Sequence, residues 1–513
     1  MTDHPEVRSL RQEILRARER VYRFGKSSPL EAFPNGGSEI WVKREDLCPV
    51  KSYKWRGACN RMALLSPEEA QRGVVAASAG NHAQGVALAA AALGIRARIF
   101  MPRTTPAVKQ EAVLRHGAGR VETVIGGDSY DDALQAALAE SRQEHTPYIH
   151  AYDDPLVMAG QGTLADEIVL SGRGPFDIAY LQIGGGGMAA GVSTWLRSYW
   201  PAIRLIGVEG EGQACTKEAF AAGQPVPLEE VDLFCDGTAV RQVGTHTFPI
   251  LRETLDEIVT VSNEEVAGAI RSMWDGLRAI PEPAGAMGLA AALRDRSAHK
   301  GKRVLVILCG ANLDFQQLGD LSYRTSEKGR PLRHLRIQIP ERAGSMLALL
   351  DECFAGVSIR QFLYAKDDSQ KAWPIFGLVA QTAAMTEMTR QLDAANYCWE
   401  DITGAEDIAF RAISLQPDQL SYPTLLRLDF YERPGALHDF LSATVRGKAN
   451  IAYFNYRYTG ERVGRALLGL DFDSAAHRRE FLEALPESGP GVRSCRPLDP
   501  ATAQRILSTA NVC

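Results

Sequence analysis

The sequence lacks the features of a membrane, secreted or zinc-binding protein. No stretch reaches the roughly 18–20 uninterrupted apolar residues that a membrane helix needs, and "GVALAAAALGI" at 85–95 comes nearest. The charged N-terminal segment has no apolar core of a signal peptide. Nine cysteines occur without a CxxC pair or a ligand-like spacing with histidine. We therefore expect a cytoplasmic protein with no structural zinc.

An excess of positive charge is also missing. The formal net charge is −5, so no basic face for nucleic acid is expected. Hydrophobic residues make up 45% and charged residues 23%, which is typical of a globular protein. At roughly 100–200 residues per domain, a chain of 513 residues predicts several domains.

Strand-like and helix-like segments alternate between about 38 and 325. Short runs such as "GVVAAS" and "IAYLQI" are separated by alanine- and leucine-rich segments such as "AQGVALAAAALG". This order is typical of α/β domains with open, twisted, mostly parallel sheets. We place one domain at 1–325, with a smaller subdomain at about 45–150, and a linker at about 318–333.

The remaining chain is an internal repeat. "RIQIPERAGSMLALLDECF" at 336–354 is echoed by "RLDFYERPGALHDFLSATV" at 427–445, with Glu341 matching Glu432 and Gly344 matching Gly435. Each copy has the pattern of a small α+β domain with helices on an antiparallel sheet. We place the two domains at 333–410 and 422–500, and they could serve either oligomerisation or effector binding.

The segment "EDLCPVKSYKWRGACNRM" at 45–62 contains a lysine in an unusual setting. Lys43 and Lys51 fit ordinary surface charges. Lys54 is flanked by aromatic residues and lies near Arg56, and both burial and a nearby cation lower a lysine's pKa. Lys54 is therefore a candidate Schiff-base lysine.

The segment "AASAGNHAQGVA" at 76–87 places a short polar loop between a strand and a helix. Backbone N–H groups at the start of that helix can hold an anion such as a carboxylate. The simpler interpretation is a helix N-cap by Ser78 or Asn81. The residues alone leave both open.

Four consecutive glycines follow the next strand in "QIGGGGMAAGVS" at 182–193. Such a loop lets the backbone approach a phosphate at the start of a helix. Gly184, Gly186 and Ala189 also fit a GxGxxA dinucleotide motif, with Glu209 as the ribose-binding acid. A nicotinamide-dependent oxidoreductase is therefore the rival interpretation of this loop.

Five ordered motifs resemble one enzyme family. "VKREDLCPVKSYKWRGA", "SAGNHAQGVA", "GGGGMAAGV", "EPAGAMGLA" and "LCGANLDF" occur as in the tryptophan-synthase-like, fold-type II enzymes. The sequence is most similar to the biosynthetic threonine dehydratases, or threonine ammonia-lyases, and the resemblance extends to the C-terminal repeat. It implies pyridoxal 5′-phosphate as cofactor and two ACT-like regulatory domains that sense isoleucine and valine.

The resemblance assigns roles to individual residues. Lys54 carries the cofactor and acts as the base, while Arg44 and Arg56 belong to the structural setting. The remaining assignments are Asn81 on the ring oxygen, Ser78, Ala79, Gly80 and His82 at the substrate, Gly184, Gly185, Gly186, Gly187 and Met188 on the phosphate, Cys309 at the pyridine nitrogen, and Glu282 near the ring. Cys309 replaces the serine of most relatives, and Glu282 could instead be a simple helix N-terminal charge.

Related activities of the same fold are less well matched. Serine racemases use a serine at the position of Ala79 to move a proton. An alanine side chain cannot do this. Some relatives bind a metal at the position of Glu209, but Gln213 and Cys215 depart from that acidic pattern, so we predict no divalent ion.

The expected reaction converts L-threonine to 2-oxobutanoate and ammonia, the first step of isoleucine biosynthesis, in a homotetramer inhibited by isoleucine. A serine dehydratase and a serine racemase of the same fold compete with this expectation. A retired amino-acid sensor, in which only the repeat binds a ligand, is a further competing hypothesis.

Overall fold

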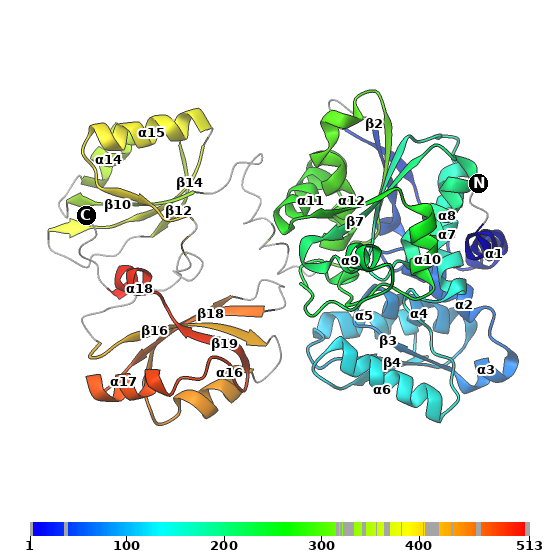
Figure 1. Cartoon of the computed structure of the whole chain (residues 1–513), viewed down its shortest axis with the longest axis horizontal. Coiled ribbons are helices and arrows are strands. Elements are labelled where there is room, and N and C mark those ends of the chain that lie inside the picture. Colours follow the sequence, from blue (N-terminus) through cyan, green and yellow to red (C-terminus); the bar gives the residue numbers. More distant parts are fainter. Residues whose placement is uncertain are drawn as a thin grey trace. The chain divides into compact units, whose positions relative to one another are not determined.

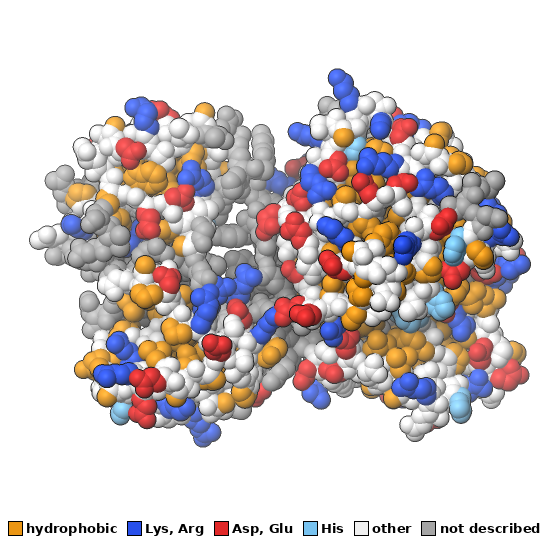
Figure 2. All heavy atoms as spheres, viewed as in Figure 1, with side chains coloured by type: hydrophobic (Ala, Val, Ile, Leu, Met, Phe, Trp, Pro, Cys, Tyr) orange, Lys and Arg blue, Asp and Glu red, His pale blue; other side chains and the backbone are white. Residues whose placement is uncertain are grey.

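The chain divides into two compact units, residues 1–318 and 319–513. The structure, a computed structural model, describes residues 4–34, 39–313, 318, 321, 333–340, 345–354, 357–363, 370–380, 382–403, 405, 420–431, 436–457 and 463–507. Within these residues no helix combines the length and the apolar character needed to cross a membrane. On the face shown in Figure 2, acidic and basic side chains are interspersed, as a small net charge leads one to expect.

The first unit contains a six-stranded sheet of order β1-β2-β9-β6-β7-β8. Only β1 runs antiparallel to its neighbour, and the other strands are parallel. The strands are β1 (Leu30–Phe33), β2 (Glu39–Arg44), β6 (Ile178–Gln182), β7 (Arg204–Gly210), β8 (Glu257–Val261) and β9 (Arg303–Leu308). Strand β6 is buried along its whole length and β9 is buried from Val304 onward, as expected of parallel strands covered on both faces.

Helices cover both faces of this sheet (Figure 1). One layer consists of α1 (Pro5–Val21), α7 (Pro155–Leu170), α8 (Gly187–Tyr199) and α10 (Thr247–Thr254), and α9 (Cys215–Ala222) packs against α10 and the edge of the sheet. On the other face, α11 (Asn263–Leu277) packs on α12 (Pro283–Arg294), which contacts β6 and β9. The apolar core between α1, α7, α8 and the sheet is continuous.

A smaller parallel sheet lies within the first unit. Its order is β3-β4-β5, formed by β3 (Val74–Ala77), β4 (Ala97–Met101) and β5 (Val121–Ile125). The helices of this part are α2 (Lys54–Met62), α3 (Pro67–Arg72), α4 (Asn81–Leu93), α5 (Ala107–Gly117) and α6 (Tyr130–Gln143). The alanine-rich α4 packs closely on α2, so the helix that begins at Lys54 is held by the small subdomain.

The second unit contains two four-stranded antiparallel sheets of the same design. The first has the order β12-β14-β10-β15 and the second β17-β18-β16-β19. The first copy consists of β10 (Arg333–Ile337), β11 (Ile339–Pro340), α14 (Ser345–Cys353), β12 (Ser358–Leu363), β13 (Lys371–Ala372), β14 (Ile375–Val379), α15 (Thr382–Ala394) and β15 (Trp399–Asp401).

The second copy repeats the order of the four sheet strands and the helices between them, without counterparts of β11 and β13 among the described residues, and adds a terminal helix. It consists of β16 (Thr424–Tyr431), α16 (Ala436–Phe440), the π-helical turn Leu441–Val445, β17 (Asn450–Arg457), β18 (Val463–Asp471), α17 (Ala475–Glu483), β19 (Val492–Pro497) and α18 (Pro500–Leu507). The equal strand order supports the repeat seen in the sequence. The matched pairs Glu341 with Glu432 and Gly344 with Gly435 lie outside the described residues.

Candidate active site

Two cavities lie at the carboxyl ends of strands β3, β6 and β9, where ligands bind in parallel α/β sheets. The glycine-loop cavity is lined by residues 184–189 together with Lys54, Asn81, Glu282 and Cys309. The α4 cavity has a volume of about 250 Å³ and is lined by residues 77–82, which include Asn81, and also by Lys54 and Glu282. Together the cavities collect every site residue predicted from the sequence.

Lys54 is the first residue of α2 and lines both cavities. Its Nζ donates a hydrogen bond to the carbonyl of Ala151 at 3.1 Å. Burial lowers the pKa of Lys54 to about 8, and the charge of Glu282 opposes this shift. A substantial fraction of the side chain is thus a neutral amine near pH 8, the form that attacks a carbonyl carbon.

The tetraglycine loop between β6 and α8 accepts no side chains. A Cβ on Gly185 would lie 2.2 Å from the ring of Tyr152, and one on Gly187 would lie 2.7 Å from the Tyr152 carbonyl. Gly186 has φ +94°, a left-handed conformation that favours glycine. No side chain caps α8, so the N–H groups at its start are available to an anion. This arrangement suits a phosphate.

The loop after β3 presents a second helix start. Gly80 is the N-cap of α4 and no side chain caps this helix. The hydroxyl of Ser78 instead accepts the N–H of Gly80 at 3.2 Å. Capping by Ser78 or Asn81, the simpler interpretation, is therefore not what the structure contains, and the helix start faces the α4 cavity.

His82 sits at the base of this loop and is buried. Its Nε2 lies 2.9 Å from the carbonyl of Ile149. Burial, reinforced by the charge of Lys54, lowers the pKa of His82 to about 3, so the ring is neutral at physiological pH.

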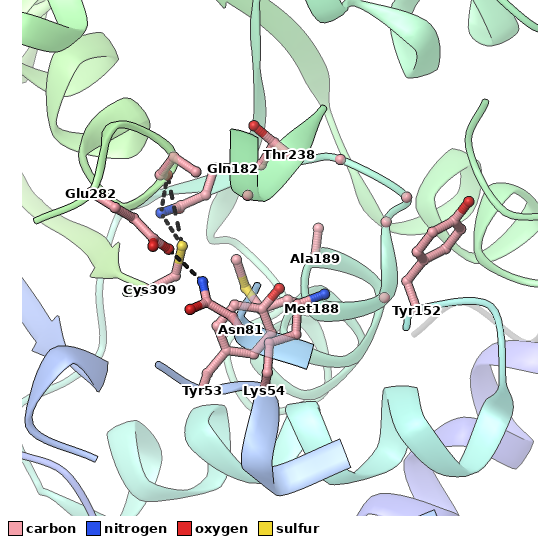
Figure 3. Close-up of a pocket in the computed structure, with 16 residues that line it drawn as sticks. Tyr53, Lys54, Asn81, Tyr152, Gln182, Met188, Ala189, Thr238, Glu282 and Cys309 are labelled. Carbon is pink, nitrogen blue, oxygen red and sulfur yellow. Dashed lines mark hydrogen bonds between the residues drawn. The ribbon is translucent and has the colours of Figure 1, made fainter. Parts of the chain in front are cut away.

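Asn81 and Glu282 meet across the cavities (Figure 3). Asn81 Nδ2 donates to Glu282 Oε1 at 2.6 Å, and the N–H of Asn312 donates to Glu282 Oε2 at 3.2 Å. Burial raises the pKa of Glu282 to about 7. Glu282 is the N-cap residue of α12, but its side chain makes no capping bond. Its carboxyl group lines both cavities.

Cys309 directly follows β9 and lines the glycine-loop cavity. Its Sγ accepts a hydrogen bond from Gln182 Nε2 at 3.2 Å (Figure 3). Burial raises the pKa of the Cys309 thiol, so the group is a neutral thiol.

The basic residues flanking Lys54 belong to buried ion pairs. Arg56 is fully buried and donates to Glu45 at 2.8 and 2.9 Å and to Glu167 at 2.6 and 3.1 Å. Lys43 also pairs with Glu167 and is buried, so the expectation of a surface charge at Lys43 is wrong. Arg44 pairs with Asp46. Neither arginine lines either of these two cavities. The ion pairs of Arg56 with Glu167 join α2, the helix that begins at Lys54, to α7.

Glu209 lines neither cavity. It is buried and accepts the N–H groups of Thr216 at 2.8 Å and Lys217 at 2.9 Å at the start of α9. A ribose-binding acid would have to face the glycine loop's ligand, so this geometry argues against a dinucleotide site. Within the described residues no cluster of three or more histidine, cysteine or acidic side chains is arranged to hold a metal ion.

Several site residues were not predicted from the sequence. Gln182 and Asn312 lie inside the quoted motifs "QIGGGGMAAGVS" and "LCGANLDF" but were given no role there, and they could have been singled out as polar residues at strand ends. Tyr152, which packs against the glycine loop, follows no recognisable pattern. Asp153 accepts the N–H groups of residues 245–247, and this long-range contact has no sequence signal.

Comparison with known proteins identifies the class. Residues 24–310 match the family model "Pyridoxal-phosphate dependent enzyme", and residues 420–501 match "C-terminal regulatory domain of Threonine dehydratase". The fold and the site thus define a fold-type II pyridoxal-phosphate enzyme with a regulatory domain.

Individual relatives narrow this class. The chain is 36% identical to the biosynthetic L-threonine dehydratase of Burkholderia multivorans, over 92% of this chain and 95% of that protein. A solved structure of threonine deaminase isoform 2 from Solanum lycopersicum matches with TM-score 0.61 and 38% identity, covering 63% of this chain and 95% of that one. Maize serine racemase matches with TM-score 0.57 and 28% identity, covering 61% and 96%. The chain belongs to the threonine dehydratase family.

The residues present fit the cofactor of this family. The glycine cradle excludes every Cβ and leaves helix N–H groups for the phosphate. The Lys54 amine can form the covalent link, and the neutral thiol of Cys309 lines the same cavity. A neutral group such as this thiol would let the pyridine nitrogen of a bound cofactor stay unprotonated, which would favour elimination over transamination.

Proposed function

We propose that this chain converts L-threonine to 2-oxobutanoate and ammonia, as the first step of isoleucine biosynthesis. The observation that supports this most strongly is the position of Lys54. Lys54 lines both cavities, one bounded by the tetraglycine loop and the other by the start of α4. One cavity suits a phosphate and the other a carboxylate, which together describe a bound amino acid beside its cofactor.

Lys54, Asn81 and the glycine loop would hold pyridoxal phosphate, which would supply an electron sink for negative charge at the substrate's α-carbon. The N–H groups of residues 78–82 bind the substrate carboxylate. The freed Lys54 amine takes the α-proton as general base, which its pKa of about 8 suits.

The products follow from this proton transfer. The β-hydroxyl leaves as water with one proton, which balances the α-proton taken by Lys54, so the released product is an enamine. Its imine form then takes up one water molecule, and 2-oxobutanoate and ammonia result. The atoms of threonine are thereby all accounted for.

Racemisation is the nearest competing activity, because maize serine racemase has a similar fold. It needs a second group that moves a proton on the face opposite the lysine. At the position expected for that group this chain has Ala79, which lines the α4 cavity and carries no titratable atom. We therefore propose elimination rather than racemisation.

The test is a keto-acid assay with purified full-length protein. We expect 2-oxobutanoate from L-threonine, a lower rate of pyruvate formation from L-serine, and no D-threonine or D-serine. The Lys54→Ala variant should lose all keto-acid formation. D-amino acid without keto acid would refute the proposal.

We also propose that isoleucine inhibits and valine modulates the enzyme through the two antiparallel domains. The regulatory-domain match at 420–501 supports this. Adding isoleucine to the assay should lower the rate, whereas a chain truncated after residue 318 should lose that response if it remains active. A rate that isoleucine leaves unchanged in the full-length protein would contradict it.

We further propose a cytoplasmic homotetramer. Light scattering should then give four times the 56.0 kDa chain mass, and fractionated cells should contain the protein in the cytoplasmic fraction. A monomeric mass would contradict the assembly.

A further inference from the structure

Asn312 lies three residues beyond Cys309 in a segment that is fixed on two sides. The N–H of Ala311 donates to the carbonyl of Lys51 at 2.9 Å. The N–H of Glu282 donates to the carbonyl of Gly310 at 3.1 Å. These two backbone hydrogen bonds connect the segment to the residues just before Lys54 and to the start of α12. They hold the backbone next to Asn312 in place.

The side chain of Asn312 contacts two carbonyl oxygens. Its Nδ2 donates to the backbone carbonyl of Val50 at 3.0 Å and to the side-chain oxygen of Asn81. A backbone carbonyl can only accept, so the contact with Val50 identifies the amide nitrogen of Asn312. The orientation of this amide therefore follows from the backbone rather than from a choice between equivalent flips.

The orientation of the Asn312 amide in turn determines the orientation of the Asn81 side-chain amide, which it contacts. Because Asn312 presents a donor, the atom of Asn81 that faces it must be the oxygen. The Asn81 amino group is then directed to the other side, toward Glu282 Oε1 and the cavities. Glu282 Oε1 accepts on that side, so Asn312 and Glu282 together hold the Asn81 amide in this orientation, with Asn312 fixing the oxygen end.

The backbone of Asn312 adds a second effect. Its N–H donates to Glu282 Oε2, while Glu282 Oε1 accepts from Asn81. Asn312 therefore contacts both partners of the pair that lies across the cavities. This backbone contact persists when only the side chain is replaced, so the two effects can be separated.

We propose that Asn312 is a positioning residue that fixes the Asn81 amide with its N–H donors toward the cofactor's ring oxygen. The proposal rests on the ring-binding role proposed for Asn81. Asn312 acts through Asn81, so its side chain matters for the cofactor only while Asn81 is present. That dependence distinguishes positioning from a general structural role.

The test is a double-mutant cycle on cofactor affinity. Pyridoxal phosphate is titrated into full-length protein freed of cofactor, for the wild type, Asn81→Ala, Asn312→Leu and the double variant. Losing one neutral hydrogen bond should raise the Kd about 3- to 10-fold in each single variant. The double variant should have the Kd of Asn81→Ala within about twofold. Asn312→Ser, which retains one hydroxyl donor, should fall between the wild type and Asn312→Leu.

Asn60→Leu is the matched control. Asn60 is buried, whereas Asn312 is half-buried. Like Asn312, Asn60 makes two side-chain hydrogen bonds: it donates to the carbonyl of Leu156 at 2.7 Å and accepts from Arg20 at 2.6 Å. It lines neither cavity. This variant should lose stability but bind pyridoxal phosphate with a Kd within about twofold of the wild type. A similar loss of affinity in Asn60→Leu and Asn312→Leu would show a general structural effect and overturn the proposal.

Each remaining outcome is equally decisive. A wild-type Kd for Asn312→Leu, or effects that multiply in the double variant, would refute the positioning role. If Asn312→Leu does not fold, the same cycle is run with Asn312→Ser under the same criteria. A wild type without Lys54-dependent cofactor binding would refute the proposed function itself, whereas multiplying effects in a functional wild type would refute only the role of Asn312.

Discussion

Gly185→Ala should weaken cofactor binding strongly without unfolding the protein. The added Cβ would lie 2.2 Å from Cδ2 and 2.3 Å from Cε2 of the Tyr152 ring, whereas non-bonded carbon atoms ordinarily approach to about 3.5–4.0 Å. The loop or the ring must therefore shift by more than about 1 Å. Such overpacking typically costs about 1–3 kcal/mol of stability.

The same shift moves backbone N–H groups away from the phosphate. A hydrogen bond to a charged group contributes about 1.5–3 kcal/mol, so the loss of one such bond raises the Kd about 10- to 100-fold. The assay is the titration of pyridoxal phosphate into the cofactor-free protein, with unfolding by urea measured in parallel.

Gly268→Ala supplies the control for this prediction. Gly268 lies in α11, and a Cβ there meets no atom within 4 Å. This variant should keep the wild-type Kd and match or slightly exceed its stability, since alanine favours a helix over glycine. A Gly185→Ala protein that binds pyridoxal phosphate within twofold of the wild type would refute the assignment of the glycine loop as the phosphate cradle.

Three further predictions concern charged groups. Burial raises the pKa of Glu282 to about 7 from 4.5. The cofactor-free protein should therefore lose up to about 3 kcal/mol of stability as pH rises between these two values. Urea unfolding should show this fall in the wild type and not in Glu282→Gln. Lys109→Met breaks the partly exposed ion pair between Lys109 and Asp236, which is 2.6 Å long and lies at the α4 cavity. This variant should raise KM for threonine a few-fold in steady-state kinetics. Its free energy of unfolding, measured in urea, should fall by less than about 1 kcal/mol. Arg56→Met leaves buried carboxylates without their main partner and should cost about 3–5 kcal/mol; an unchanged urea midpoint would contradict this reasoning.

The site was largely predictable from the sequence because its parts are local motifs at strand ends. The segments 76–87 and 182–193 each contain a strand end, a loop and a helix start, so their geometry follows from a few adjacent residues. The order of the motifs then identified the enzyme family. The family, the cofactor and the fold class were confirmed by the comparisons.

What could not be predicted depends on contacts between distant residues. Tyr152 packs on Gly185, and Asn312 contacts Asn81 from 231 residues away. The short strand β15 pairs with β10 through only three residues, too few for a recognisable alternation. Lys43 fitted a surface charge in the sequence, yet it is buried beside Glu167, which lies 124 residues further along the chain.

The most direct test of the central claim is borohydride reduction of the holoenzyme followed by peptide mass spectrometry. Reduction makes the bond between lysine and cofactor permanent, so the modified residue can be read from the peptide. We expect the pyridoxyl group on Lys54 and on neither Lys43 nor Lys51, although all three lie within twelve residues of one another. A modification at either of those two lysines, or none in the whole chain, would contradict the assignment of Lys54 as the cofactor-bearing residue.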